Sequence, residues 1–213
     1  MRVSAPVLDR KRPTTVSSVD ATRERLLDAA AQTFARDGIR GATTREIARE
    51  ASVNEVTLFR HFKSKQQLLL AVLERGLASE VAIMDQHSSW KENLRENMEK
   101  YARHYYSHIE KKKGIARAFL AEAQILPKPM QTMIAEVIRP VRQRLVLILE
   151  DAQKAGVVRK DVDVECALDA FKNTLYAGML RQGVYLPRNY TTDTYISTVV
   201  DIFVRGIETT TPH

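Results

Sequence analysis

Apolar residues along this chain recur every three or four positions, which is the periodicity of an amphipathic α-helix. The first such stretch begins near residue 22, and its apolar face consists of Leu26, Leu27, Ala30 and Phe34. Runs in which β-branched and polar residues alternate, the pattern typical of strands, do not occur. We therefore predict an all-α fold of about nine helices.

Capping residues divide the first 86 residues into four helices. Gly38 offers a left-handed end to the first helix. Side-chain oxygens that can accept backbone N–H bonds then precede three apolar stretches, which predicts three helix starts. The capping residues are Thr43 with Glu46, Asn54, and Ser64 with Gln67. The second and third helices are short, and the fourth extends to about Gln86.

The remainder of the chain predicts longer helices, separated by breaks rich in glycine, proline or lysine. We expect these helices at about residues 90–110, 115–126, 129–155, 163–184 and 191–208. Pro140 should kink or divide the third of them, because proline donates no backbone hydrogen bond. Residues 1–19 mix proline, serine, threonine and basic side chains without periodicity, and we expect a flexible basic arm there.

Residues 44–62 form the pattern that points to function. Two short helices are joined by a turn that leaves room only for a tight corner, and the small Ala48 lets the helices cross closely. The side chains expected to fill this corner are Ile47, Val53, Leu58 and Phe62. This is the spacing of a helix-turn-helix, whose second helix presents its N-terminal turn to DNA bases. A generic corner in a helical bundle is the alternative.

Charge supports a nucleic-acid partner. The 213 residues contain 33 Lys and Arg against 26 Asp and Glu, a net charge of +7. Residues 1–65 hold 13 basic and 8 acidic side chains, so most of the excess surrounds the helix-turn-helix. A polyanion is the natural partner, although a solvated basic face is also compatible with this count.

Composition narrows the class of protein further. A hydrophobic content of 44% is that of an ordinary globular protein, and the longest apolar runs are much shorter than a membrane span. The start lacks the apolar segment of an export signal, and one cysteine cannot form an intramolecular disulfide. We expect a cytoplasmic protein without a membrane partner, in which Cys166 is a small buried apolar residue.

A first helix ending in FARDG is followed by the segment GATTREIAREASV and then by the run TLFRHFKSKQQLLLAV. In these segments, over residues 22–73, the sequence resembles the TetR family of bacterial transcriptional regulators. Beyond these, the chain matches the family in length, in its all-helical layout and in a turn at residues 156–163. The resemblance implies a homodimeric repressor that binds an inverted-repeat operator in double-stranded DNA. It also implies release from that operator when a small-molecule effector fills the C-terminal domain.

The resemblance divides the chain into the arm at 1–19, a DNA-binding domain at 20–66, and a ligand-binding and dimerisation domain at 67–213. Matching positions imply that Arg45 contacts guanine or phosphate, and that His61 and Lys65 face phosphate. The full set of implied DNA-contacting residues is Thr43, Thr44, Arg45, Asn54, Glu55, Thr57, Phe59, His61, Lys63 and Lys65.

Two positions depart from the family pattern. Ser52 stands where glycine is usual, and it would cost about 1 kcal/mol if the turn is left-handed there. Phe59 replaces the common tyrosine, which removes a hydroxyl that could touch phosphate. Arg60 is expected to be a solvated helix charge, and the basic arm at residues 10–12 either enters a minor groove or stays in solvent.

Methionine and aromatic residues in the second domain indicate where a ligand could bind. Such adaptable side chains suit a cavity for a flat or apolar molecule. The candidates, for each of which plain core packing is the alternative, are Met84, Trp90, Met98, Tyr101, Tyr105, Phe119, Met130, Met133 and Tyr176. The helix from Ser64 to about Gln86 is expected to carry the ligand signal, and Gly76 could let it bend.

The last two helices are expected to form the dimer interface. Small side chains along one side let two backbones approach, so the two helices doubled by symmetry would make a four-helix contact. The expected interface residues are Ala167, Ala170, Thr174, Ala177, Gly178, Tyr195, Val199, Ile202 and Phe203. Packing of this stripe within its own subunit is the alternative.

Other classes of protein find less support. His104 and His108 stand one turn apart but lack a carboxylate at ligand spacing, so we expect no metal or other cofactor. A metal-responsive or ligand-independent regulator is the alternative. The chain lacks a glycine-rich phosphate loop, GxSxG, HExxH and CxxC, so we do not expect an enzyme. A basic module for acidic surfaces would need its charge along one helix face, whereas here it surrounds a helix-turn-helix.

Overall fold

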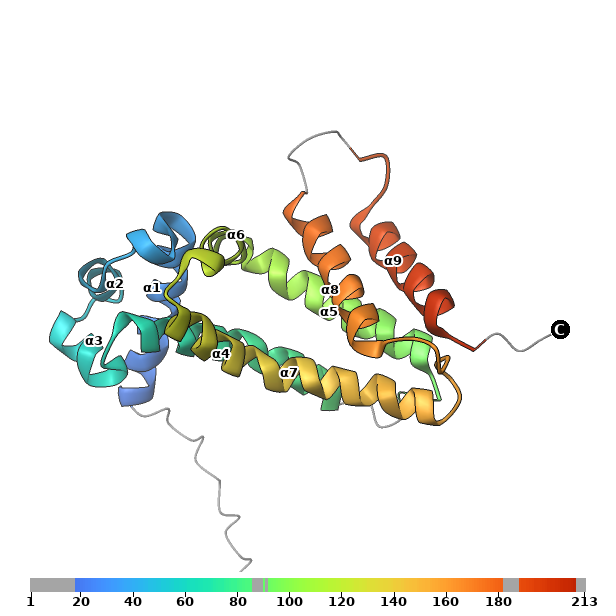
Figure 1. Cartoon of the computed structure of the whole chain (residues 1–213). Coiled ribbons are helices and arrows are strands. Elements are labelled where there is room, and N and C mark those ends of the chain that lie inside the picture. Colours follow the sequence, from blue (N-terminus) through green and yellow to red (C-terminus); the bar gives the residue numbers. More distant parts are fainter. Residues whose placement is uncertain (1–17, 86–89, 91, 182–187, 210–213) are drawn as a thin grey trace, which may run out of the picture.

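The computed structural model is built almost entirely from helices (Figure 1). It describes residues 18–85, 90, 92–181 and 188–209. Within these residues the extended backbone is limited to an isolated bridge between Val158 and Glu208, which confirms the all-α prediction. The helices are α1 (Ser18–Gly41), α2 (Thr44–Glu50), α3 (Glu55–Phe62), α4 (Lys65–Asp85), α5 (Leu94–Lys111), α6 (Lys113–Glu122), the short 3-10 helix η1 (Ala123–Ile125), α7 (Lys128–Lys154), α8 (Val164–Leu180) and α9 (Thr192–Ile207).

The predicted capping residues start the short N-terminal helices. The Thr43 hydroxyl oxygen accepts the Glu46 N–H at 3.2 Å, and the hydroxyl donates to the Glu46 carboxylate at 2.8 Å. Asn54 and Ser64 cap α3 and α4 by accepting backbone N–H bonds at 2.8 and 3.1 Å. Gly38 has a φ of 77°, as predicted, and a further helical turn follows it within α1. The three predicted helix starts are therefore confirmed.

Two later boundaries differ from the prediction. α5 begins at Leu94 rather than near residue 90, where the chain forms a turn. α7 continues through Pro140 as one helix of 27 residues, so a division there was wrong. Proline removes one backbone hydrogen bond from this long helix. The helix packs against both α4 and α8, and these contacts support it on either side of Pro140. The predicted flexible arm lies outside the described residues, except for residues 18 and 19, which belong to α1.

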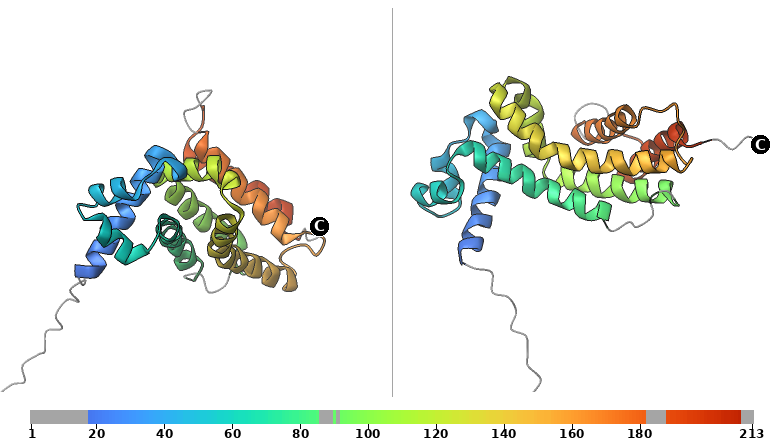
Figure 2. Two further views of the ribbon diagram at one scale, coloured as in Figure 1. Left: turned by 60° about the vertical axis from the view of Figure 1, so that its left-hand side comes forward. Right: turned by 60° about the horizontal axis from the view of Figure 1, so that its bottom comes forward.

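Two apolar cores occupy the two ends of an elongated molecule (Figures 1 and 2). One core lies under α1–α3, and it also takes buried side chains from α4 and Met130 and Ile134 from α7. The other lies among α5, α7, α8 and α9 and includes Leu145 and Leu168. Because α4 and α7 run side by side along the molecule, they connect the two ends. The N-terminal core thus extends beyond residue 66, where the sequence places the domain boundary.

The length and the hydropathy of a helix decide whether it can cross a bilayer. None of the described helices is both long and apolar enough to do so.

Candidate DNA-binding surface and effector cavity

A tight corner between α2 and α3 positions the second helix of the motif. The Val53 N–H donates to the Ala48 carbonyl at 3.0 Å, and the Ser52 N–H donates to the Arg49 carbonyl at 3.1 Å. Ser52 has a φ of 53°, which is the left-handed conformation that the family's usual glycine would adopt freely. The helix-turn-helix corner predicted at residues 44–62 is therefore present.

The outward face of α3 carries large apolar side chains together with a positive charge. Val56 is 73% exposed and Phe59 is 42% exposed, and Arg60 is exposed one turn beyond Val56. Exposed apolar groups on such a helix suit contact with thymine methyl groups in the major groove. Sequence reasoning missed Val56 and assigned Arg60 to solvent. The available signal was that Val56 lies opposite the buried Leu58 and Phe62 on the helix.

The other implied DNA-contacting residues surround this face. Exposed side chains belong to Thr43, Arg45, Asn54, Phe59 and Lys63, and partly buried ones belong to Thr44, Glu55, Thr57, His61 and Lys65. The Thr44 hydroxyl donates to a Glu55 carboxylate oxygen, which ties the start of α2 to the start of α3. One of the two oxygens with which Glu55 could accept from cytosine is thereby occupied.

Lys65 is directed toward the end of α1, a structural role that differs from the phosphate contact implied for it. Its Nζ donates to the carbonyl oxygens of Arg40 at 3.1 Å and Ala42 at 2.7 Å. Burial lowers the pKa of the Lys65 ammonium, while the Glu122 carboxylate acts in the opposite direction. The side chain instead joins the start of α4 to the end of α1. Sequence spacing could not reveal this contact, because it depends on how α1 and α4 pack.

A cavity of about 190 Å³ lies in the middle of the molecule, with walls from α1, α4, α5, α6, α7 and α8. Most of its wall is apolar and includes Leu73, Leu77, Ile109, Ile115 and Ile138. Concave, mainly apolar sites with a few polar groups are typical of small-molecule binding. This cavity is the candidate effector site.

Three of the nine predicted ligand-binding residues line this cavity, namely Tyr105, Phe119 and Tyr176. The others do not. Met84, Trp90, Met98 and Tyr101 are buried in the C-terminal core, Met130 is buried in the N-terminal core, and Met133 lies at the surface. These six positions agree with the core or surface alternative, and a ligand contact there stays a prediction. Helical periodicity shows that a side chain points inward, but it does not show whether the space there is filled.

A buried ion pair forms one polar end of the cavity. Glu80, which is 4% exposed, accepts from Lys172 Nζ and from the Tyr101 hydroxyl, each at 3.0 Å. The Lys172 ammonium also lies 4.5 Å from the centre of the Tyr105 ring. Burial raises the pKa of Tyr101 and Tyr105, and the nearby Glu80 charge adds to the effect. The positive charge of Lys172 thus lies beside the negative charge of the Glu80 carboxylate, and the Tyr101 hydroxyl donates a further hydrogen bond to it.

Basic side chains form the other polar part of the cavity wall: Arg75, His108 and Lys112. A Cβ placed on Gly76 would lie 3.8 Å from His108 Nε2 and 4.0 Å from Lys112 Nζ, so glycine leaves open the space between these groups. Arg75 pairs with Glu24 at 3.0 Å and with Asp28 at 2.8 Å, which joins α4 to α1. The pKa values of His108 and Lys112 are lowered, mainly by burial.

Helix α6 connects the cavity to the DNA-binding end by a second route. A Cβ on Gly114 would lie only 2.7 Å from the Cβ of Ala35, so α6 crosses α1 very closely. At the other end of α6, the Glu122 carboxylate accepts the backbone N–H groups of Ile39 at 3.2 Å and Arg40 at 2.8 Å. Sequence reasoning assigned the connection to the α4 helix alone. The structure adds α6, because this helix packs directly on α1.

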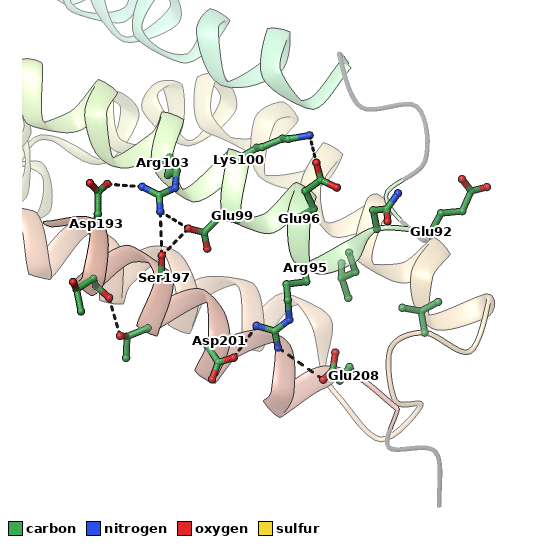
Figure 3. Close-up of a pocket in the computed structure, with 15 residues that line it drawn as sticks. Glu92, Arg95, Glu96, Glu99, Lys100, Arg103, Asp193, Ser197, Asp201 and Glu208 are labelled. Atoms are coloured by element: carbon green, nitrogen blue, oxygen red, sulfur yellow. Dashed lines mark hydrogen bonds and ion pairs between the residues drawn. The ribbon is translucent and has the colours of Figure 1, made fainter. Parts of the chain in front are cut away.

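A larger groove between α5 and α9 has a different character (Figure 3). Its charged side chains pair with one another, both between the two helices and within α5. Arg103 contacts Asp193 and Glu99, and Arg95 contacts Asp201 at 2.7 Å. Figure 3 shows these pairs in a row along the groove. The groove therefore serves to join α5 to α9, and the smaller apolar cavity is the better effector site.

The expected dimer residues separate into an exposed and an inward set. Ala170, Thr174, Ala177 and Ile202 are exposed, Ala167 is partly exposed, and Gly178, Tyr195, Val199 and Phe203 pack within the subunit. The Tyr195 ring lies against Gly178 with no room for a Cβ, and its hydroxyl donates to the Thr174 carbonyl at 2.8 Å. Packing within the subunit thus accounts for the inward set.

Two further expectations concern single residues. Cys166 is exposed on α8, so its predicted burial was wrong. Its backbone N–H donates to the Asp163 carboxylate at 2.9 Å, which caps the start of α8. The rings of His104 and His108 lie 6.2 Å apart and nearly parallel. Within the described residues no group of three or more His, Cys, Asp or Glu side chains could hold a metal ion.

Two family models match this chain. The model described as bacterial regulatory proteins of the tetR family covers residues 26–72. The model described as a tetracyclin repressor-like C-terminal domain covers residues 86–202, which is more than half of the chain. Both halves of the fold therefore match models of one family.

Curated relatives match over most of their length. A helix-turn-helix transcriptional regulator of Bacillus subtilis, YvkB, is 28% identical over 194 residues, covering 87% of this chain and 97% of the relative. The transcriptional repressor KstR2 of Rhodococcus jostii is 26% identical, covering 87% and 92%. These relatives are named as regulators of transcription.

Solved structures share the fold. The ketosteroid transcriptional regulator KstR2 of Mycobacterium tuberculosis superposes with a TM-score of 0.62 at 25% identity, covering 92% of this chain and 98% of that one. The regulator FadR of Bacillus subtilis, solved in complex with stearoyl-CoA, gives a TM-score of 0.70 at 20% identity, covering 87% and 99%.

Proposed function

Because this chain belongs to the tetR family of bacterial regulatory proteins, we propose that it is a homodimeric repressor that leaves an inverted-repeat DNA operator when a small molecule fills its central cavity. It would act in the cytoplasm, where bacterial DNA lies. The observation that carries the proposal is the outward face of α3, where exposed Val56, Phe59 and Arg60 stand beside a helix-turn-helix corner.

Each part of this surface has a separate task in DNA binding. Val56 and Phe59 supply apolar contacts to base edges, while Arg45 at the start of α2 supplies a charge to guanine or phosphate. The basic residues around them provide the sequence-independent attraction to the phosphate backbone.

Release by a ligand is supported by the position of the cavity. Its wall includes residues of α4 and α6, and both helices contact α1 of the DNA-binding end. A ligand that separates α4 from α6 would therefore move α1 and, with it, the corner that holds α3. In a dimer, such a movement changes the spacing of the two α3 helices, which must stay near one DNA turn, roughly 34 Å, to bind both half-sites.

The dimer is supported by the exposed side of α8 and α9. Ala170, Thr174 and Ala177 keep the outer side of α8 shallow, and Ile202 of α9 is 67% exposed although it is apolar. Small residues beside an exposed apolar one suit close packing of two helix pairs across a twofold axis.

The test is selection of bound sequences from random duplex DNA, followed by anisotropy titrations of the selected operator. Arg45→Ala and Val56→Ala should each weaken operator binding by about 1–3 kcal/mol and relax preference at a position of the site. Lys160→Ala removes an exposed charge far from α3 and serves as the control. Selection that yields no preferred sequence, or normal preference in both the Arg45→Ala and the Val56→Ala variant, would contradict the proposal.

A further inference from the structure

We infer that the molecule bound in the central cavity is an amphipathic anion, with its apolar body among α4–α8 and its anionic group held by Arg75, His108 and Lys112. This inference rests on the proposed function, because it names the chemical class of effector for the same cavity. The supporting observations are the charges in the cavity wall, the volume of the cavity and the ion pairs of Arg75.

The basic side chains gather on one part of the cavity wall. His108 Nε2 and Lys112 Nζ both lie over Gly76, and Arg75 is the neighbouring residue on α4. Lys112 is half-buried, and the carboxylate that acts on its ammonium is Asp28, which already pairs with Arg75 at 2.8 Å. A partly buried ammonium that shares its nearby carboxylate with Arg75 is only partly compensated for the water that burial removes. An anion placed between these groups would supply a carboxylate that Lys112 does not share.

No unpaired carboxylate opposes an anion at this place. Among the residues that line the cavity, Glu80 has the one carboxylate, and it is bonded to Lys172 and Tyr101 at 3.0 Å each. The remaining lining side chains are mostly apolar. The cavity therefore offers a positive end and an apolar body, which match a molecule with one anionic group and a hydrocarbon or single-ring tail.

The volume of the cavity guides the choice of a probe. A cavity of about 190 Å³ has room for several water-sized groups, each of which takes ~30 Å³ in the liquid. A straight chain of about six to eight carbons, or one aromatic ring with a short linker, fills such a space. Octanoate is therefore a suitable probe.

Arg75 connects anion binding to the DNA-binding end. Its guanidinium pairs with Glu24 and Asp28 of α1 at 3.0 and 2.8 Å. A carboxylate near Lys112 would compete with these two side chains for the same guanidinium. Binding would then weaken the contact between α4 and α1, and the competition must act equally in both directions.

The experiment compares three probes of equal chain length by isothermal titration calorimetry: octanoate, 1-octanol and octylamine. We expect octanoate to bind at least about tenfold more tightly than 1-octanol, because charge-assisted hydrogen bonds add to the apolar contact. Lys112→Gln and Arg75→Gln should remove this preference. Lys111→Gln, which removes an exposed charge from the adjacent position, should retain it.

A further variant tests the competition for Arg75. Asp28→Asn removes one of the competing carboxylates, so it should tighten octanoate binding about threefold or more and leave 1-octanol binding unchanged. Unchanged octanoate binding in this variant would overturn the competition.

The outcomes separate this inference from the proposed function. Equal binding of octanoate and 1-octanol, tighter binding of octylamine, or no binding of any probe would overturn the anion site, even if the protein binds its operator normally. If octanoate binds as expected but operator anisotropy is unaffected by it, the anion site stands and release by a ligand is the part that fails.

Discussion

Replacing Lys65 with methionine distinguishes a side chain that holds the DNA-binding end together from one that touches DNA. Methionine keeps much of the apolar stem but removes the ammonium that donates to Arg40 and Ala42 at 3.1 and 2.7 Å. Two carbonyl oxygens at the end of α1 then lose their partner. The expected result is a less stable protein whose DNA contacts are unchanged in number.

The magnitude follows from these two bonds. Hydrogen bonds to a charged group contribute about 1.5–3 kcal/mol when buried, and the partial exposure of Lys65 reduces this, so we expect a loss of about 2 kcal/mol. A domain of this size loses roughly 2–4 °C of Tm for each kcal/mol. Lys65→Met should therefore lower the Tm by about 4–8 °C and weaken operator binding at every salt concentration alike.

The assay combines differential scanning calorimetry with operator titrations over a range of salt concentrations. A lost phosphate contact lowers the slope of log K against log salt by about 0.9, whereas a lost structural contact leaves it unchanged. Lys63→Met is the matched control, because Lys63 is exposed at the end of α3 and should change the slope but not the Tm. A reduced slope with an unchanged Tm for Lys65→Met would refute the reasoning.

Three further substitutions address packing, assembly and pH. Gly114→Val should lower the free energy of unfolding in urea by about 1–3 kcal/mol, because even a Cβ there would lie 2.7 Å from Ala35. Ile202→Asp should convert a dimer into monomers in sedimentation velocity, since it places a charge on the exposed side of α9. Glu50→Gln should lower the Tm at pH 7, and the difference from wild type should shrink in acid. The hydrogen-bonded Arg36 lowers the pKa of Glu50 below its ordinary value of 4.5, so this stabilisation is present above that value and is lost as the pH falls through the folded-state pKa.

Each of these expectations has a control or a contrary result. Gly206→Val should have a smaller effect than Gly114→Val, because nothing lies within 4 Å of a Cβ at Gly206. Leu147→Asp places the same charge on another exposed apolar position and should leave the dimer intact. A Tm difference between Glu50→Gln and wild type that is constant from pH 7 to pH 3 would show that the ion pair with Arg36 does not form.

The sequence by itself determined the features that depend on contacts within a few residues. The caps at Thr43, Asn54 and Ser64 form as predicted, because each bond joins atoms two or three residues apart. The predicted corner between α2 and α3 likewise depends on short-range bonds, from Ser52 to Arg49 and from Val53 to Ala48. Helical periodicity also indicates which side chains leave water, since the hydrophobic effect depends on burial and not on a particular partner.

Only the tertiary structure decided which distant groups meet. Lys65 is directed to carbonyls at the end of α1, and Gly178 receives the ring of Tyr195. The apolar space bordered by basic side chains exists because α4, α5 and α6 leave it open near Gly76. A buried methionine such as Met98 and a cavity-lining Tyr105 have the same inward-facing signature in the sequence. What separates them is the packing of neighbouring helices, which the local pattern does not specify.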